Sequence, residues 1–151
     1  MPPNPGLEQA RRDFGPRAAQ IIEDFDLLDD WEDRYRYVIE LARELTPLAT
    51  EEKTEANKVR GCASQVWLSA HREKVEGGVR LTFSGDSDAL IVKGLVAVLM
   101  RLYSGESPET IASRDAQALF ARLGLGSHLS QQRSNGFFSM VARIQALARG
   151  A

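Results

Sequence analysis

Cys62 is the only cysteine among the 151 residues, and a thiolate is the nucleophile of sulfur chemistry. It follows Gly61 at the predicted junction of a loop and a strand. A glycine there lets the backbone bend and leaves the sulfur approachable. The neighbouring cations Lys58 and Arg60 are expected to favour the thiolate. The alternative is a buried cysteine that serves only as a small apolar side chain.

A single cysteine restricts the chemistry that is open to the chain. It excludes an intrachain disulfide, so nothing points to an oxidising compartment. His71 and His128 are too few and too distant in sequence to complete a closed zinc site with it, and we expect neither a metal nor a cofactor. A hydrolase pair of Cys62 with either histidine is conceivable, but no local signature supports it.

Two other patterns resemble functional motifs. Asp86 and Asp88 form a carboxylate pair, but both precede an apolar helix, whose N-terminus they are expected to cap and complement. The segment 124–126 has two glycines, lacks a third and follows a predicted helix, so it is no dinucleotide-binding fingerprint. Trp31 and Trp67 are expected in the core rather than at a ligand site.

The composition is that of one ordinary globular domain. A formal charge of -2 and a pI near 5.7 argue against nucleic acid as a partner, because phosphate binding needs a basic patch. The longest apolar stretch, residues 89–103, contains Lys93 and Arg101 and is too short to span a bilayer. With no signal-peptide pattern at the N-terminus, we expect a cytoplasmic protein that does not bind membranes.

The periodicity of apolar residues predicts the elements that position the cysteine. Residues 1–15 are expected to be a flexible N-terminal segment, and residues 16–151 a single domain. A period of two on both sides of Gly77-Gly78 predicts an antiparallel hairpin. The loop before it, residues 48–60, is expected to hold a short strand near Asn57–Val59.

Helices surround this predicted sheet. The helix expected to be buried centrally follows Asp86 or Ser87 as its cap and ends near residue 102. The other predicted helices cover residues 16–25, Asp29 or Asp30 to Pro47, a short stretch from Pro108, 116–123 and 131–149. Ser107 is expected to cap the short stretch and Asp115 the helix 116–123, which should end at Gly124. A small sheet with several helices packed on it makes the fold class α+β.

Four ordered motifs resemble the SufE/CsdE family of sulfur-acceptor proteins and together span roughly residues 16–148. They are Gly61–Trp67 around the cysteine, Trp31–Leu41, Gly85–Leu95, and His128-Leu129 with Arg133-Ser134-Asn135-Gly136. The sequence departs from the family at Gln131-Gln132, where Pro-Ser is frequent, and at Ala42-Arg43, which replaces a glycine-containing pair. These departures leave the choice between the SufE and CsdE branches open.

The resemblance implies a fold of several helices on a three-stranded antiparallel sheet, similar to the U-type iron–sulfur scaffolds. Unlike such scaffolds, which need several thiolates to hold a cluster, this chain has one. The resemblance further implies that Cys62 accepts sulfur as a persulfide. Arg60, Gly61, Asp88 and Arg133 are its expected supporting or partner-docking residues.

The implied partners are a SufS/CsdA-like cysteine desulfurase, which carries pyridoxal phosphate, and a downstream acceptor such as a SufBCD-like scaffold. The chain itself is expected to be a transfer partner rather than an enzyme. Because a persulfide is vulnerable in water, we expect its sulfur to be shielded by Val59, Ala63 and Val66 and to turn outward on docking. Open alternatives are an allosteric desulfurase activator with a structural Cys62, a cysteine-dependent hydrolase and a thiol redox sensor.

Overall fold

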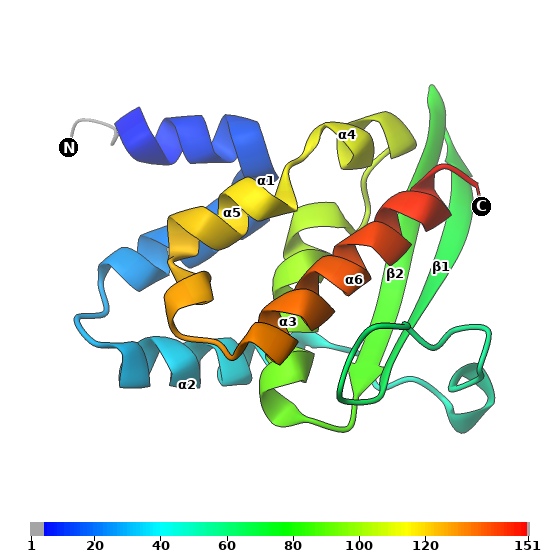
Figure 1. The fold of residues 1–151 in the computed structure, drawn as a ribbon. Coiled ribbons are helices and arrows are strands. Elements are labelled where there is room, and N and C mark those ends of the chain that lie inside the picture. The colour runs from blue at the N-terminus through cyan, green and yellow to red at the C-terminus, as the bar shows by residue number, and fades with distance from the viewer. Residues whose placement is uncertain (1–4, 151) are drawn as a thin grey trace.

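A computed structural model that describes residues 5–150 has one buried helix at its centre and two long strands on one side of it (Figure 1). Strands β1 (Val66–Val75) and β2 (Gly78–Ser87) pair antiparallel along their whole length. The turn between them needs glycine, because Gly77 has φ +86°. The predicted hairpin is therefore confirmed, and its first strand begins directly after the Cys62 loop.

The sheet has two strands within the described residues, not the three that the family resemblance implied. In place of the third strand, one isolated antiparallel bridge joins Lys58 to Trp67. The Val59 N–H donates to the Val66 carbonyl at 2.8 Å, and the Leu68 N–H donates to the Asn57 carbonyl at 2.9 Å. Turns at residues 55–57 and 60–61 bend the chain away on both sides of this contact, which leaves room for one bridge only.

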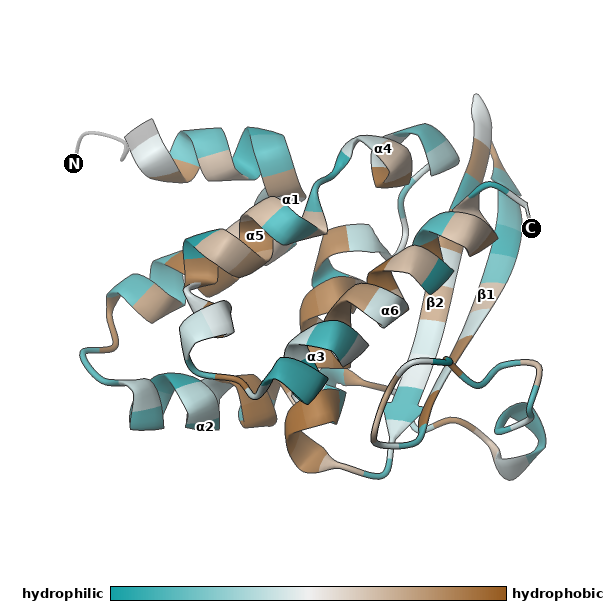
Figure 2. Ribbon diagram, viewed as in Figure 1, coloured by the Kyte–Doolittle hydropathy of each residue, from teal (hydrophilic) through white to brown (hydrophobic). Residues whose placement is uncertain are grey.

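Helix α3 (Leu90–Tyr103) is the buried central helix that its apolar sequence predicted. It is hydrophobic over most of its length, whereas α1 (Pro5–Asp26) carries many hydrophilic residues (Figure 2). Gly94 lets α2 (Trp31–Leu41) approach closely, since a Cβ at Gly94 would lie 2.2 Å from the Val38 carbonyl oxygen. The N-cap of α2 is Asp30, one of the two residues at which the sequence placed the start of this helix, and its carboxylate accepts from the Asp33 N–H.

Helix α1 begins at Pro5 and consists of two helical segments, the second of which begins at Pro16, where the sequence pattern placed the first helix. Gly15, with φ +82°, kinks it just before Pro16. Residues 5–15, which we expected to form a flexible segment, are thus helical, and Ala10 and Phe14 are buried. The rest of that predicted segment, residues 1–4, lies outside the described residues.

The last third of the chain returns across α3 through three helices: α4 (Pro108–Ser113), α5 (Ala116–Leu123) and α6 (Gln131–Ala148). Their predicted boundaries follow local signals, because Ser107 and Asp115 cap two of them and Gly124 ends α5 in the left-handed conformation. Short 3-10 turns cover Ala42–Glu44, Thr50–Glu52 and Leu125–Ser127. None of the helices within residues 5–150 has the length and apolar character required to cross a membrane.

Candidate functional site

Cys62 lies on a six-residue loop, 60–65, whose two ends are held together by the Lys58–Trp67 bridge. Its thiol is half-buried and donates a weak hydrogen bond to the Gly136 carbonyl, 3.5 Å from Sγ. Gly61 has φ +88°, a conformation that favours glycine. A Cβ at Gly61 would also lie 2.5 Å from the Ser139 hydroxyl oxygen. Gly61 therefore allows the loop to turn and to rest against α6.

Gly136 provides the matching surface on α6. A Cβ at this position would lie 3.4 Å from the Cys62 sulfur and 3.8 Å from its Cα and Cβ. The glycine of the Arg133-Ser134-Asn135-Gly136 motif thus leaves space for the cysteine loop to pack against α6. The helical periodicity of residues 131–149 indicated a core-facing side but gave no sign that Gly136 meets Cys62.

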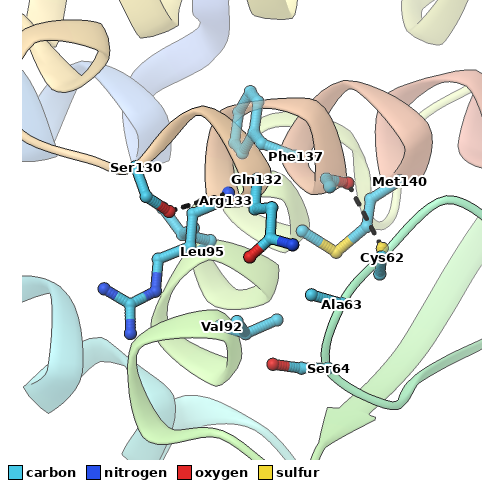
Figure 3. A pocket seen from close by; sticks show the side chains of 11 residues that line it. Cys62, Ala63, Ser64, Val92, Leu95, Ser130, Gln132, Arg133, Phe137 and Met140 are labelled. Atoms are coloured by element: carbon cyan, nitrogen blue, oxygen red, sulfur yellow. Dashed lines mark hydrogen bonds between the residues drawn. The ribbon is translucent and has the colours of Figure 1, made fainter.

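A cavity of about 330 Å³ lies beside the thiol (Figure 3). Its apolar lining comes mainly from α3 and α6, which contribute Val92, Leu95, Phe137 and Met140, and Ala63 of the loop adds to it. Polar groups complete the lining, namely Ser64 of the loop with Ser130, Gln132 and Arg133 at the start of α6. In Figure 3, Cys62 and Arg133 lie at opposite ends of this group of side chains, with Gln132 between them.

The environment of Cys62 favours the neutral thiol in this conformation. Burial raises the pKa of the Cys62 thiol above its ordinary value. Arg60 is exposed and pairs with Glu55 at 3.4 Å. The expectation that Lys58 and Arg60 favour the thiolate is therefore wrong for this conformation. The thiol is held in a less reactive state than a free cysteine would have.

Asp88 ties the cysteine loop to the start of α3. The Gln65 N–H donates to Asp88 Oδ1 at 3.0 Å, and the Asp88 N–H donates to the Gln65 carbonyl at 3.2 Å. The predicted capping role is wrong, because α3 has Ala89 as its N-cap and no side-chain cap. The Asp88 carboxylate instead accepts a hydrogen bond from the backbone of the cysteine loop.

Asp86 fixes the segment that leads to the cysteine. It is buried between Lys53 and Lys93, each 3.4 Å from one of its carboxylate oxygens. Burial, the largest single influence, raises the pKa of Asp86, but the Ser87 N–H and the two lysines together hold it below its ordinary value. Lys53 also lies over the Trp67 ring at 5.4 Å. Asp86 therefore joins the residue 48–60 segment to β2 and α3 instead of capping α3.

Replacing Asp88 with alanine is expected to loosen the cysteine loop. The variant loses the acceptor for the Gln65 N–H, which is one of the contacts that hold residues 60–65 in place. Alkylation of Cys62 in the free protein should become about threefold to tenfold faster, as the loss of roughly 1 kcal/mol would give. The matched control is Asp29→Ala, which removes an exposed carboxylate far from the loop in sequence. Equal alkylation rates for the two variants would contradict the role assigned to Asp88.

Arg133 reaches the cavity from the first turn of α6. Its guanidinium donates to the Tyr35 hydroxyl at 3.4 Å and forms no ion pair with any described residue. Arg60 does not line the cavity. Of the predicted site residues, the structure thus brings Cys62 and Arg133 to one cavity, uses Gly61 and Asp88 to hold the loop, and leaves Arg60 beside Glu55.

Neither histidine lines the cavity. His128 stacks on Trp31, with 3.7 Å between the ring centroids, and His71 is exposed on β1. A hydrolase pair with Cys62 therefore has no support in this geometry. Across residues 5–150, no group of three or more His, Cys, Asp or Glu side chains is placed to hold a metal ion.

Comparison with known proteins gives consistent matches over most of the chain. The family model "SufE: Fe-S metabolism associated domain" matches residues 19–148. An uncharacterized SufE-like protein of Rhizobium etli is 51% identical over 143 residues, covering 95% of this chain and 97% of that protein. A second, from Rhizobium meliloti, is 50% identical over 131 residues, covering 87% of this chain and 94% of that protein.

A solved structure has a similar fold. The solution structure of a hypothetical protein from Thermus thermophilus aligns with a TM-score of 0.70 and 26% sequence identity. The alignment covers 90% of this chain and 96% of that one. The matched family region contains the cysteine loop and both helices that line the cavity.

Proposed function

Because the chain belongs to the SufE family, we propose that it is a cytoplasmic sulfur carrier that serves a cysteine desulfurase. Cys62 takes the sulfur as a persulfide and passes it to a downstream acceptor, which we assign to iron–sulfur cluster assembly. The observation that most directly supports this proposal is the position of the only thiol. It lies on a short loop, half-buried at the edge of a cavity, within the matched family region.

The transfer step follows thiol–disulfide exchange. The desulfurase uses its pyridoxal phosphate to place sulfur from free cysteine on its own cysteine. The Cys62 thiolate then attacks the outer sulfur of that persulfide, the S–S bond breaks, and the desulfurase cysteine leaves as a thiolate. The thiolate fraction of Cys62 and its accessibility set the rate of this step. Burial raises the pKa of Cys62 and covers part of the thiol in the conformation described here, so docking is expected to raise both.

The cavity suits storage of the persulfide between the two transfers. The apolar side chains of Val92, Leu95, Phe137 and Met140 limit contact of the persulfide with bulk water and keep protein-sized reductants away from it. We expected Val59, Ala63 and Val66 to provide this shield. Ala63 does line the cavity, whereas Val59 and Val66 are buried beside the bridge and do not. The shield that supports the proposal is contributed mainly by α3 and α6, with Ala63 from the loop.

Release of the thiol requires movement of a small segment only. The Lys58–Trp67 bridge fixes the ends of the loop, so residues 60–65 can turn outward without disturbing the sheet. The contacts to be broken are modest: a 3.5 Å hydrogen bond to Gly136 and the exposed Gln65–Asp88 pair. Leu90, 65% exposed at the start of α3 next to this pair, offers apolar surface for the docking partner.

Alkylation kinetics should report this movement. In the free protein the rate should rise with pH through a midpoint above about 8.5, the ordinary value for cysteine, because burial raises the pKa of Cys62. An excess of desulfurase whose own sulfur-carrying cysteine is replaced should accelerate alkylation and lower the midpoint. The alkylation rate of Cys62 in unfolded protein serves as the reference for a fully exposed thiol. Equal rates with and without the desulfurase would contradict docking-dependent exposure.

Labelled sulfur tests the transfer. We expect label from free cysteine to appear on this chain only when an active desulfurase is present, and to leave when a thiol reductant is added. Label that stays on the desulfurase while its turnover rises would favour an allosteric activator instead.

A further inference from the structure

The cavity beside Cys62 is larger than storage of one sulfur atom requires. Its volume of about 330 Å³ lies at the lower end of the range of small-molecule sites, roughly 300–1,000 Å³. The cysteine occupies one end of it (Figure 3). The remaining space is therefore available to a molecule about the size of an amino acid.

The two ends of the cavity differ in chemistry. Near the sulfur the wall is formed by Met140 and Ala63, which lie beside Cys62 in Figure 3, with Ser64 next to Ala63. At the other end Arg133 has no carboxylate partner among residues 5–150, and its guanidinium can bind a carboxylate through two parallel hydrogen bonds. The first turn of the 18-residue helix α6 adds positive potential at the same end. This lining fits a molecule that is anionic at one end and soft or apolar at the other.

The position of the loop favours a small molecule over a protein segment. Cys62 is half-buried, lies against Gly136 and faces the cavity, so a protein thiol reaches it only after residues 60–65 move. A small thiol can enter the cavity while the loop stays closed. The cavity therefore selects by size as well as by charge.

We propose that this cavity binds a low-molecular-weight thiol carrying a carboxylate, of which free cysteine is an example, and that Cys62 exchanges sulfur with it while the loop is closed. The proposal rests on the carrier function, because it needs a persulfide at Cys62. Arg133 binds the carboxylate, and the apolar end places the thiol next to the Cys62 sulfur.

The exchange is balanced without an external oxidant or reductant. The thiolate of the small molecule attacks the outer sulfur of the Cys62 persulfide. A new S–S bond forms on the small molecule, the S–S bond at Cys62 breaks, and Cys62 leaves as a thiolate. The proton of the persulfide stays with the transferred sulfur. The reverse reaction loads Cys62 from a small persulfide.

Two alkylating reagents that differ in charge test the binding part without any desulfurase. Iodoacetate carries the carboxylate, whereas iodoacetamide is neutral and nearly the same size. The ratio of the iodoacetate rate to the iodoacetamide rate should be about fivefold higher in the folded protein than in the unfolded protein, as one solvent-screened charge-assisted hydrogen bond would give. Arg133→Gln should return the ratio to the unfolded value.

The control is Arg36→Gln, which removes the same charge from an exposed position on α2, outside the cavity. This variant should keep the wild-type ratio. If both variants lose the preference for iodoacetate, the preference comes from overall charge and the proposal is overturned. Equal ratios in folded and unfolded wild-type protein would also overturn it.

A measurement without variants uses propionate, which should slow iodoacetamide alkylation of wild-type protein, whereas 1-propanol should not. Propionate without effect would also overturn it.

The exchange part is tested on persulfidated protein separated from the desulfurase. At equal thiolate concentrations, 3-mercaptopropionate should discharge Cys62 several-fold faster than 3-mercapto-1-propanol, and Arg133→Gln should equalise the two rates. Equal rates in wild-type protein would overturn the exchange while leaving the carrier function intact. If Cys62 never acquires sulfur, the carrier function fails, and the alkylation ratio still decides whether the cavity prefers a carboxylate.

Discussion

Cys62→Ser is expected to leave desulfurase turnover at the level of the enzyme alone, whereas the wild-type chain should accelerate it. A serine hydroxyl is not ionised near neutral pH and forms no persulfide, so the variant offers no acceptor for the enzyme-bound sulfur. The assay measures alanine formed from free cysteine at saturating concentrations of the chain. The whole stimulation should disappear, which makes this the largest functional effect that we expect from one substitution.

The substitution changes one atom at a half-buried position, so the fold should persist. The thermal unfolding midpoint should stay within a few degrees of wild type, as for a change of about 1 kcal/mol or less. A variant that is folded and still stimulates the desulfurase fully would identify the chain as an allosteric activator with a structural Cys62.

Gly94→Ala is expected to produce the largest loss of stability. The added Cβ would lie 2.2 Å from the Val38 carbonyl oxygen and 2.7 Å from its carbonyl carbon, so the backbones of α2 and α3 would have to separate. Such overpacking should lower the free energy of unfolding by about 2–4 kcal/mol. The helix propensity of alanine, worth about 1 kcal/mol relative to glycine, offsets only part of this cost. Denaturant unfolding measures the difference.

Gly136→Ala is the matched control, because it makes the same change inside another helix. There the new Cβ meets the Cys62 sulfur at 3.4 Å, an ordinary contact with a loop that can move. Its free energy of unfolding should stay within about 1 kcal/mol of wild type. Comparable stability of the two variants would show that the close approach of α2 to α3 at Gly94 does not constrain the fold.

The elements predicted correctly from sequence are those with strong local signals. The hairpin follows from alternation around Gly77-Gly78, and α3 from its nearly continuous apolar surface. Ser107, Asp115 and Gly124 act as the predicted helix boundaries, because capping depends on residues three or four positions away. These features need no knowledge of the remainder of the chain.

For the first helix, the helical spacing of apolar residues was a better guide than the Pro- and Gly-rich composition. Leu7, Ala10 and Phe14 are spaced by three and four residues, which is the pattern of a helix face. The Pro- and Gly-rich residues around them suggested a flexible segment instead. In the structure a kink at Gly15 separates this helical segment from the one that begins at Pro16.

The properties of the site depend on contacts that sequence does not reveal. Gly136 is 74 residues from Cys62, and burial of the thiol against α6 raises its pKa although two cations are close in sequence. Asp88 was expected at a helix N-terminus, but its partner is Gln65, 23 residues earlier. The cysteine itself was identified correctly as a loop residue. Its protonation and its partners required the packing of α6 and α3 against the loop.

The most direct measurement is the intact mass of the chain after incubation with a cysteine desulfurase, free cysteine and pyridoxal phosphate. We expect the mass to increase by one sulfur atom per chain, at Cys62, and to return to its starting value on addition of a thiol reductant. A chain whose mass does not change, while the desulfurase consumes cysteine in the same mixture, would contradict the assignment of Cys62 as the sulfur acceptor.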